Sequence, residues 1–129
     1  MKQPPDPQLV PAIHAERAAL LDFVALLERE QGMLVENPTD HDQLLALSEQ
    51  KSVAAKGLNK LSETRLSLLQ KNLPQSGAEA IRNWLKAHSP QGLAVWQEIL
   101  ALAERARRLN QANGELIQMK MRRNQQMFA

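Results

Sequence analysis

Residues 44–68 read LLALSEQKSVAAKGLNKLSETRLSL, and their hydrophobic spacing indicates the fold class. One helical face recurs there in alternating steps of three and four: Leu44, Leu47, Lys51, Ala54, Leu58, Leu61, Arg65 and Leu68. Six of these eight residues are apolar. Such regularity is typical of coiled-coil packing, in which one face of a helix is buried against its neighbours. The stretch therefore predicts a long helix that packs along one side.

The residues on either side give this helix its ends. Thr39 and Asp40 are favourable N-cap residues, and an acidic or amide residue follows each of them three positions later, as in a capping box. Pro74 cannot continue a helix. We expect the helix to run from Asp40 to Leu73, a length of about 50 Å.

A second long helix is expected upstream. Residues 1–10 contain three prolines and are interpreted as a flexible leader that ends near Pro11, a residue suited to a first helical position. The helix then runs to about Glu36, because Asn37-Pro38 stops it. Its expected buried stripe consists of Ile13, Leu20, Leu21, Val24, Leu27 and Leu34.

Two helix starts follow downstream. Ser76 and Glu79 form a capping box that predicts a short helix over residues 77–88. Ser89 is then a cap and Pro90 a first-turn residue, so a last long helix is expected to begin there. Its broad apolar face consists of Leu93, Trp96, Ile99, Leu100, Leu102, Ala103, Ala106 and Leu109.

Together these segments predict one all-α domain over residues 1–129. We expect an elongated antiparallel bundle of three long helices with a short connecting helix and an amphipathic C-terminal helix. The composition agrees, because Leu and Ala supply 38 residues whereas Val, Ile and Thr supply 11. The chain has no cysteine for a disulfide, no signal peptide and no apolar run near the roughly 20 residues that span a bilayer. These features predict a cytoplasmic protein.

Charge is unevenly distributed although the net charge is only +2. Residues 1–50 carry a net −6, whereas residues 51–103 and 104–129 each carry +4. An acidic first segment can pack beside basic later ones, and this internal pairing is favoured over a nucleic-acid patch.

Two cations lie on the seam of the second helix, where an aliphatic residue would pack more easily. Lys51 and Arg65 either extend their stems along the edge of the bundle or pair with upstream carboxylates such as Glu16, Glu28 or Glu30. In the second interpretation the pairs fix the helical register. The sequence leaves both interpretations open.

The sequence lacks the spacing patterns of metal-binding and phosphate-binding motifs. His14, His41 and His88 lie far apart, without the spacing of a zinc pair, and no Glu-x-x-His pair of a helical di-iron site occurs. The five glycines never cluster into a phosphate-binding loop. We therefore expect no enzymatic activity, no metal and no cofactor.

The segment 104–129 is basic, amphipathic and rich in methionine. Asn113-Gly114 interrupts its apolar pattern, either as a kink or as a helix end. Flexible thioethers suit a surface that adapts to a partner helix; the alternative is that the same side chains complete the bundle core. Binding to RNA or anionic lipid is less favoured, because no aromatic residues are interleaved with the basic ones. Its apolar residues are Leu109, Leu116, Ile117, Met119, Met121, Met127 and Phe128.

Three features occur in an order that is informative. They are an acidic first helix ending Leu26-Leu27-Glu28-Arg29-Glu30, the leucines around Lys51 and Arg65, and Trp96 followed by Ala103, Leu109 and Asn110-Gln111-Ala112-Asn113-Gly114. Together they resemble the FlgN family of flagellar type III export chaperones, over roughly residues 16–125. The N-x-x-N-G run after a leucine-rich helix is the most specific element.

The resemblance implies a cytoplasmic chaperone, without ATP or metal, that binds the hook-filament junction proteins FlgK and FlgL. It would prevent their premature assembly and deliver them to the flagellar export gate. The residue patterns above predict no nucleic-acid partner and no stable membrane insertion, and the resemblance implies a monomer without cargo. Residues 104–129 would be the partner-binding segment. The partner-binding residues it implies are Leu109, Asn113, Gly114, Leu116, Ile117 and Met121.

Two further expectations accompany the resemblance. Since the chain has no tyrosine, either Phe128 is the aromatic anchor for gate docking or there is no such anchor. The alternative function is a structural coiled-coil adaptor or scaffold that acts by self-association.

Overall fold

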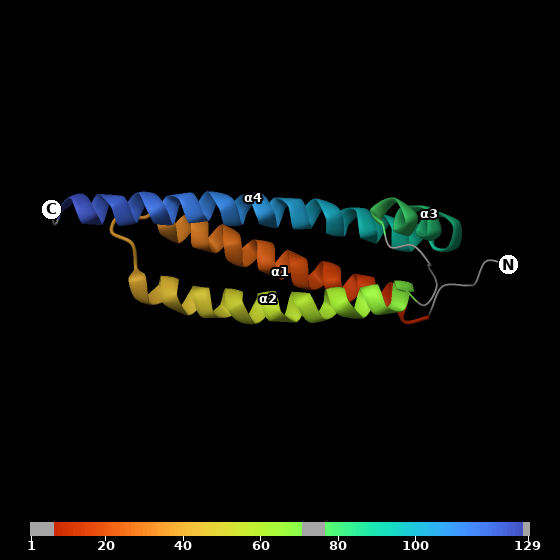
Figure 1. The fold of residues 1–129 in the computed structure, drawn as a ribbon. Helices are drawn as coiled ribbons and strands as arrows, with labels where there is room; N and C mark the ends of the chain where they lie inside the picture. The colour runs from red at the N-terminus through yellow and green to blue at the C-terminus, as the bar shows by residue number, and fades with distance from the viewer. Residues whose placement is uncertain (1–6, 71–76, 128–129) are drawn as a thin grey trace.

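The structure is a computed structural model that describes residues 7–70 and 77–127 (Figure 1). The described residues form helices and their connections, without strands, so the all-α prediction is confirmed. Three helices are long and one is short: α1 (Leu9–Val35), α2 (His41–Gln70), α3 (Ala78–His88) and α4 (Pro90–Met127).

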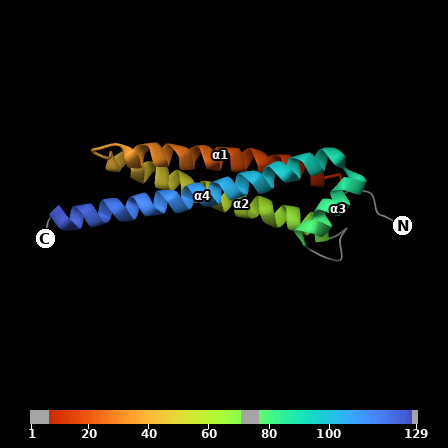
Figure 2. The same ribbon diagram turned by 90° about the horizontal axis from the view of Figure 1, so that it is seen from above.

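The central element is α1, which packs against both α2 and α4, whereas α3 packs against α4. In Figure 1 the chain runs leftward along α1, rightward along α2 and, after α3, leftward again along α4. Therefore α1 is antiparallel to α2 and parallel to α4. The product is an elongated rod, and α4 projects beyond the end of α1 (Figures 1 and 2). No helix within the described ranges is long and apolar enough to cross a membrane.

The first helix begins earlier than the sequence predicted. Leu9 opens α1, two residues before Pro11, and its side chain is fully buried together with that of Ile13. Pro11 is tolerated because backbone N–H groups of a first helical turn have no partner within the helix. Of the expected leader, residues 1–6 lie outside the described residues. The helix ends at Val35, as Asn37-Pro38 predicted.

Local capping explains two of the helix starts. The Gln43 backbone N–H donates to Asp40 Oδ1 at 3.1 Å, which confirms Asp40 as the cap of α2. The Gly92 N–H donates to Ser89 Oγ at 3.1 Å, which confirms the cap of α4. The capping box predicted for α3 begins at Ser76, outside the described residues, and Gly77 is the N-cap position there.

The seam predicted on α2 is confirmed. Leu47 and Leu68 are buried, and the other six seam positions are partly buried, while most of the remaining α2 side chains are exposed. This single buried face is what α1 covers. The predicted end at Leu73 lies outside the described residues.

The largest apolar core lies near α3. It joins α1, α2, α3 and α4 through Leu9, Ile13, Leu20, Leu68, Leu69, Ile81, Trp84, Leu85, Val95, Trp96 and Ile99. A smaller cluster of Val24, Leu27 and Ala106 follows along α1 and α4.

Three predicted core positions are wrong. Leu21 is 51% exposed and Leu100 is 45% exposed, and Ala103 is exposed as well. The buried stripe of α1 instead includes Glu16 and Glu30, polar positions that a search for apolar residues passes over. Because the stripe is narrow, Leu21 falls beside it.

The Asn113-Gly114 pair does not end the last helix, which continues from Pro90 to Met127. Of the two alternatives at this pair, a helix end is therefore wrong. The residues after Gly114 therefore continue the helix that carries the apolar face of residues 93–109. The direction of that helix fixes how they lie relative to α1.

Candidate functional site

Several large apolar side chains are exposed in the part of α4 that runs beside the end of α1. Within residues 114–123, here called the α4 tail, Ile117 is 37% exposed, Met119 58% and Met121 57%. A run of large exposed apolar residues on one helix is a recognised feature of interaction surfaces. The α4 tail is therefore the first candidate site.

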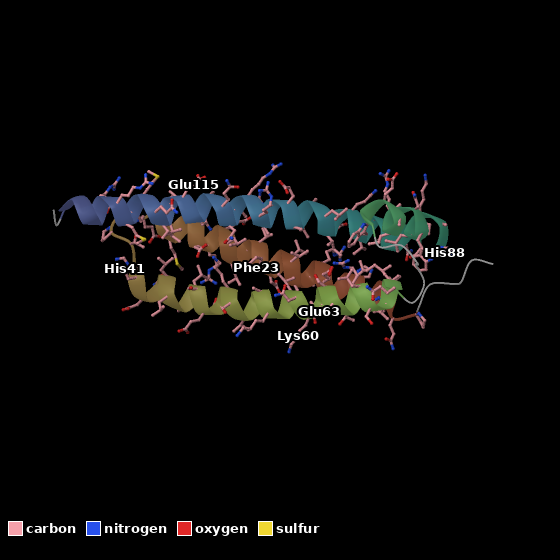
Figure 3. All side chains as sticks on the ribbon, viewed as in Figure 1. Phe23, His41, Lys60, Glu63, His88 and Glu115 are labelled. Carbon is pink, nitrogen blue, oxygen red and sulfur yellow. The ribbon has the colours of Figure 1, made fainter. Side chains whose placement is uncertain are left out.

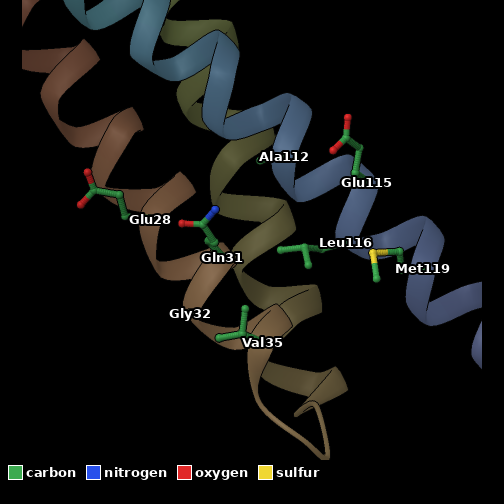
Figure 4. A pocket seen from close by; sticks show the side chains of 8 residues that line it. All are labelled: Glu28, Gln31, Gly32, Val35, Ala112, Glu115, Leu116 and Met119. Atoms are coloured by element: carbon green, nitrogen blue, oxygen red, sulfur yellow. The ribbon is translucent and has the colours of Figure 1, made fainter.

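A groove lies beside the tail, between α4 and the end of α1 (Figure 4). Its volume is about 580 Å³, within the range of roughly 300–1,000 Å³ that is usual for ligand sites. In the close-up, Leu116 points from α4 toward α1. This α1–α4 groove is lined by Glu28, Gln31, Gly32, Val35, Ala112, Glu115, Leu116 and Met119.

A buried polar cluster holds α4 on α1 next to the groove. The Asn113 side chain is fully buried, and its Nδ2 donates to the Leu27 carbonyl and to Glu30 Oε1, each at 2.9 Å. Lys51 Nζ donates to both Glu30 carboxylate oxygens at 2.9 and 3.0 Å and reaches Asn110 Oδ1 at 3.5 Å. Three helices therefore meet at one buried carboxylate.

A second polar cluster lies inside the main apolar core. Arg65 Nε donates to the two Glu16 carboxylate oxygens at 2.7 and 3.0 Å, and Ser62 Oγ donates to Glu16 at 3.4 Å. The Arg65 guanidinium lies 4.7 Å from the centre of the Trp96 ring, a cation–π distance. Both seam cations thus pair with α1 carboxylates, and the interpretation as extended stems is wrong.

Surface ion pairs of both polarities also connect α1 with α4. Glu28 pairs with Arg105 at 2.7 Å, and Arg17 pairs with Glu98 at 3.1 Å. Lys120 Nζ donates to the Glu36 carbonyl at 3.0 Å and to the Thr39 hydroxyl, which ties the α4 tail to the α1–α2 connection. The predicted pairing of the acidic first segment with basic later ones is confirmed at Glu28–Arg105, as at Glu16–Arg65 and Glu30–Lys51, whereas Arg17–Glu98 has the opposite polarity.

Another group of charges belongs to α4 alone. Arg107 and Arg108 donate hydrogen bonds to Glu104 and lower the pKa of that carboxyl to about 2. The same carboxylate raises the pKa of Arg107. These ion pairs lie on the surface between residues one helical turn apart, and they neutralise part of the positive charge of α4.

The six predicted partner-binding residues divide into two groups. Leu116, Ile117 and Met121 are partly or largely exposed on the α4 tail. In contrast, Asn113 is buried, Leu109 packs against the cluster around Val24, and Gly114 is partly buried. Phe128 lies outside the described residues.

Sequence reasoning missed the α1 side of the groove. Gly32 and Val35 lie near the end of α1, and neither belongs to the buried stripe that periodicity reveals. An exposed glycine within an otherwise regular helix was the available signal, because glycine weakens a helix and needs another reason to be there.

No group of three or more potential metal-ligating side chains comes together within residues 7–70 and 77–127. Figure 3 places His41 and His88 at opposite ends of the bundle. The His88 ring instead stacks on Trp84, with ring centres 4.7 Å apart.

One comparison with known proteins identifies a family. A family model described as FlgN protein matches residues 6–129. No curated protein and no solved structure matches the chain. The family match covers nearly the whole sequence, including both the main core and the α4 tail.

Proposed function

The chain belongs to the FlgN family of cytoplasmic, non-enzymatic flagellar export chaperones for the hook-associated proteins FlgK and FlgL, and from this premise we propose that the α4 tail binds the cargo. The observation that carries the proposal is the exposure of Ile117, Met119 and Met121 on the α4 tail, which runs beside the end of α1. An amphipathic partner helix would cover these side chains.

Within this proposal the six predicted residues have two roles. Ile117 and Met121 contact the cargo because they are exposed, and Leu116 contacts it because it lines the groove beside the tail. Leu109, Asn113 and Gly114 position the tail: Leu109 and Asn113 join α4 to α1, and Gly114 is the first residue of the tail.

Cargo capture also explains how such a protein works without a catalytic group. Covering apolar segments of FlgK and FlgL would prevent them from assembling prematurely, and ordering of a flexible segment on binding keeps affinity moderate, so that release at the export gate is feasible. Without cargo, the protein is a monomer in this proposal, and sedimentation velocity at micromolar concentration measures that state directly.

Calorimetric titration with the C-terminal segments of FlgK and FlgL tests the proposal. The wild-type chain is expected to bind one segment per molecule. The double variant Leu116→Asp/Ile117→Asp should lose this binding, because two charges would be desolvated under the cargo. Since Leu116 is partly buried, Met119→Asp/Met121→Asp provides a second variant at more exposed positions.

The matched control is Leu45→Asp/Val53→Asp, which places the same charges at exposed apolar positions of α2. It should bind cargo as the wild type does, and all variants should retain their helical circular dichroism. Wild-type affinity in both tail variants, or equal loss of affinity in the α2 control, would contradict the proposal.

A further inference from the structure

We infer that the α1–α4 groove receives a large apolar side chain of the cargo, from an amphipathic segment that carries a basic residue beside that anchor. This inference rests on the proposed function and extends the contact surface from α4 onto α1. The groove borders the α4 tail through Leu116 and Met119, so one bound segment can contact both surfaces.

Two of the residues that line the groove are small. Gly32 of α1 and Ala112 of α4 both line it, and a Cβ atom added at Gly32 would meet no atom within 4 Å. Larger apolar side chains surround this space, namely Val35, Leu116 and Met119. A hollow lined by these small residues and apolar side chains fits a single bulky side chain, as in knobs-into-holes packing.

Charge at the rim points to the neighbour of that anchor. Glu28 is already paired with Arg105 at 2.7 Å, whereas Glu115 makes no ion pair with any described residue. Figure 3 shows Glu115 on the outer side of α4, away from α2. A Lys or Arg of the cargo, placed next to the apolar anchor, would form an ion pair with the Glu115 carboxylate.

Filling the hollow tests the inference without disturbing the bundle. Gly32→Leu puts a side chain into the space that the cargo anchor would occupy, and Gly57→Leu is its matched control. Both glycines are exposed within helices, and neither has an atom within 4 Å of the added Cβ. We expect Gly32→Leu to weaken binding of the FlgK or FlgL segment by about tenfold or more, and Gly57→Leu to leave it unchanged.

The charge is tested separately by Glu115→Lys, which should weaken binding at low salt and lose this effect at high salt. Unchanged affinity in Gly32→Leu, while Leu116→Asp/Ile117→Asp has lost binding, would overturn the groove inference and leave the proposed α4 surface intact. Failure of the proposed function is distinguishable, because the tail variants would then bind normally as well. A second copy of the chain seated in the groove is a further contradicting outcome, seen as dimers that Gly32→Leu abolishes.

Discussion

The α3 end and the tail end of the bundle are built from the same long helices but differ in what fills the space between them. Around α3 the space is filled by a continuous apolar core that includes Trp84, Leu85 and Trp96. Toward the tail, a buried polar cluster around Glu30 and Asn113 takes over. Beyond it, Leu34 of α1 is still buried, but Ile117, Met119 and Met121 of the α4 tail are exposed.

This difference indicates that the two ends of the rod have different roles, one in stability and the other in binding. Apolar burial gives most of the stability of a small domain, so the α3 end holds the fold together. Polar contacts specify register more than they stabilise, so the tail is aligned on α1 while its apolar side chains stay available. Substitutions at the two ends should therefore affect different measurements.

The largest difference between the ends is expected at the two buried carboxylates. Glu16→Ala leaves Arg65 without its ion-pair partner inside the main core, and we expect it to lower the free energy of unfolding by about 3–5 kcal/mol. Glu30→Ala should cost less, because Lys51 has a long flexible stem that can turn toward water. Urea unfolding of both variants measures the difference, with exposed Glu28→Ala as the control. Equal losses would contradict the distinction between the two clusters.

Truncating apolar side chains compares the ends directly. Leu85→Ala removes a fully buried side chain near α3 and is expected to lower the free energy of unfolding by about 2–5 kcal/mol. Met119→Ala, at a position 58% exposed, should leave it nearly unchanged. Thermal unfolding measures both. A stability loss in Met119→Ala similar to that in Leu85→Ala would show that the tail belongs to the core.

An intermediate effect is expected at the junction between core and tail. Asn113→Ala removes the donor to Glu30 and to the Leu27 carbonyl, which should destabilise the fold by about 1–3 kcal/mol. Asn110→Ala is the control, because its contact with Lys51 is long at 3.5 Å and exposed. If Asn113→Ala unfolds in urea as the wild type does, the buried amide is not what aligns the tail.

The smallest effects are expected from adding a methyl group at two glycines of α4. At Gly114 a Cβ would meet nothing within 4 Å, so Gly114→Ala should stabilise the helix by up to about 1 kcal/mol. At Gly92 the Cβ would lie 2.8 Å from Ser89 Oγ, and Gly92→Ala should destabilise the α3–α4 turn. Melting temperatures of the two variants should shift in opposite directions; shifts of the same sign would contradict this account of the turn.

Local patterns predicted much of the fold correctly. Seam spacing located the buried face of α2, and Ser89 and Asp40 were identified as caps because their interactions reach only three residues along the chain. Lys51 and Arg65 were recognised as unusual on an apolar seam, although only the structure distinguishes their pairing with Glu30 and Glu16 from the alternative.

Features that depend on contacts between helices were not predictable in the same way. Asn113-Gly114 has the composition of a helix end, but the Asn113 side chain is held by α1 and the helix continues. The α1–α4 groove brings Gly32 together with Ala112 from the far end of the sequence. No periodicity within one helix shows such a juxtaposition.

Hydrogen exchange of the free and cargo-bound chain most directly tests the claim that the α3 end stabilises the fold while the α4 tail binds cargo. In the free protein, backbone amides of the α4 tail should exchange faster than those of residues 95–106, which belong to the packed part of α4. Adding the C-terminal segment of FlgK or FlgL should slow exchange in the tail and leave α3 unchanged. Protection that appears around α3, with none in the tail, would contradict the account.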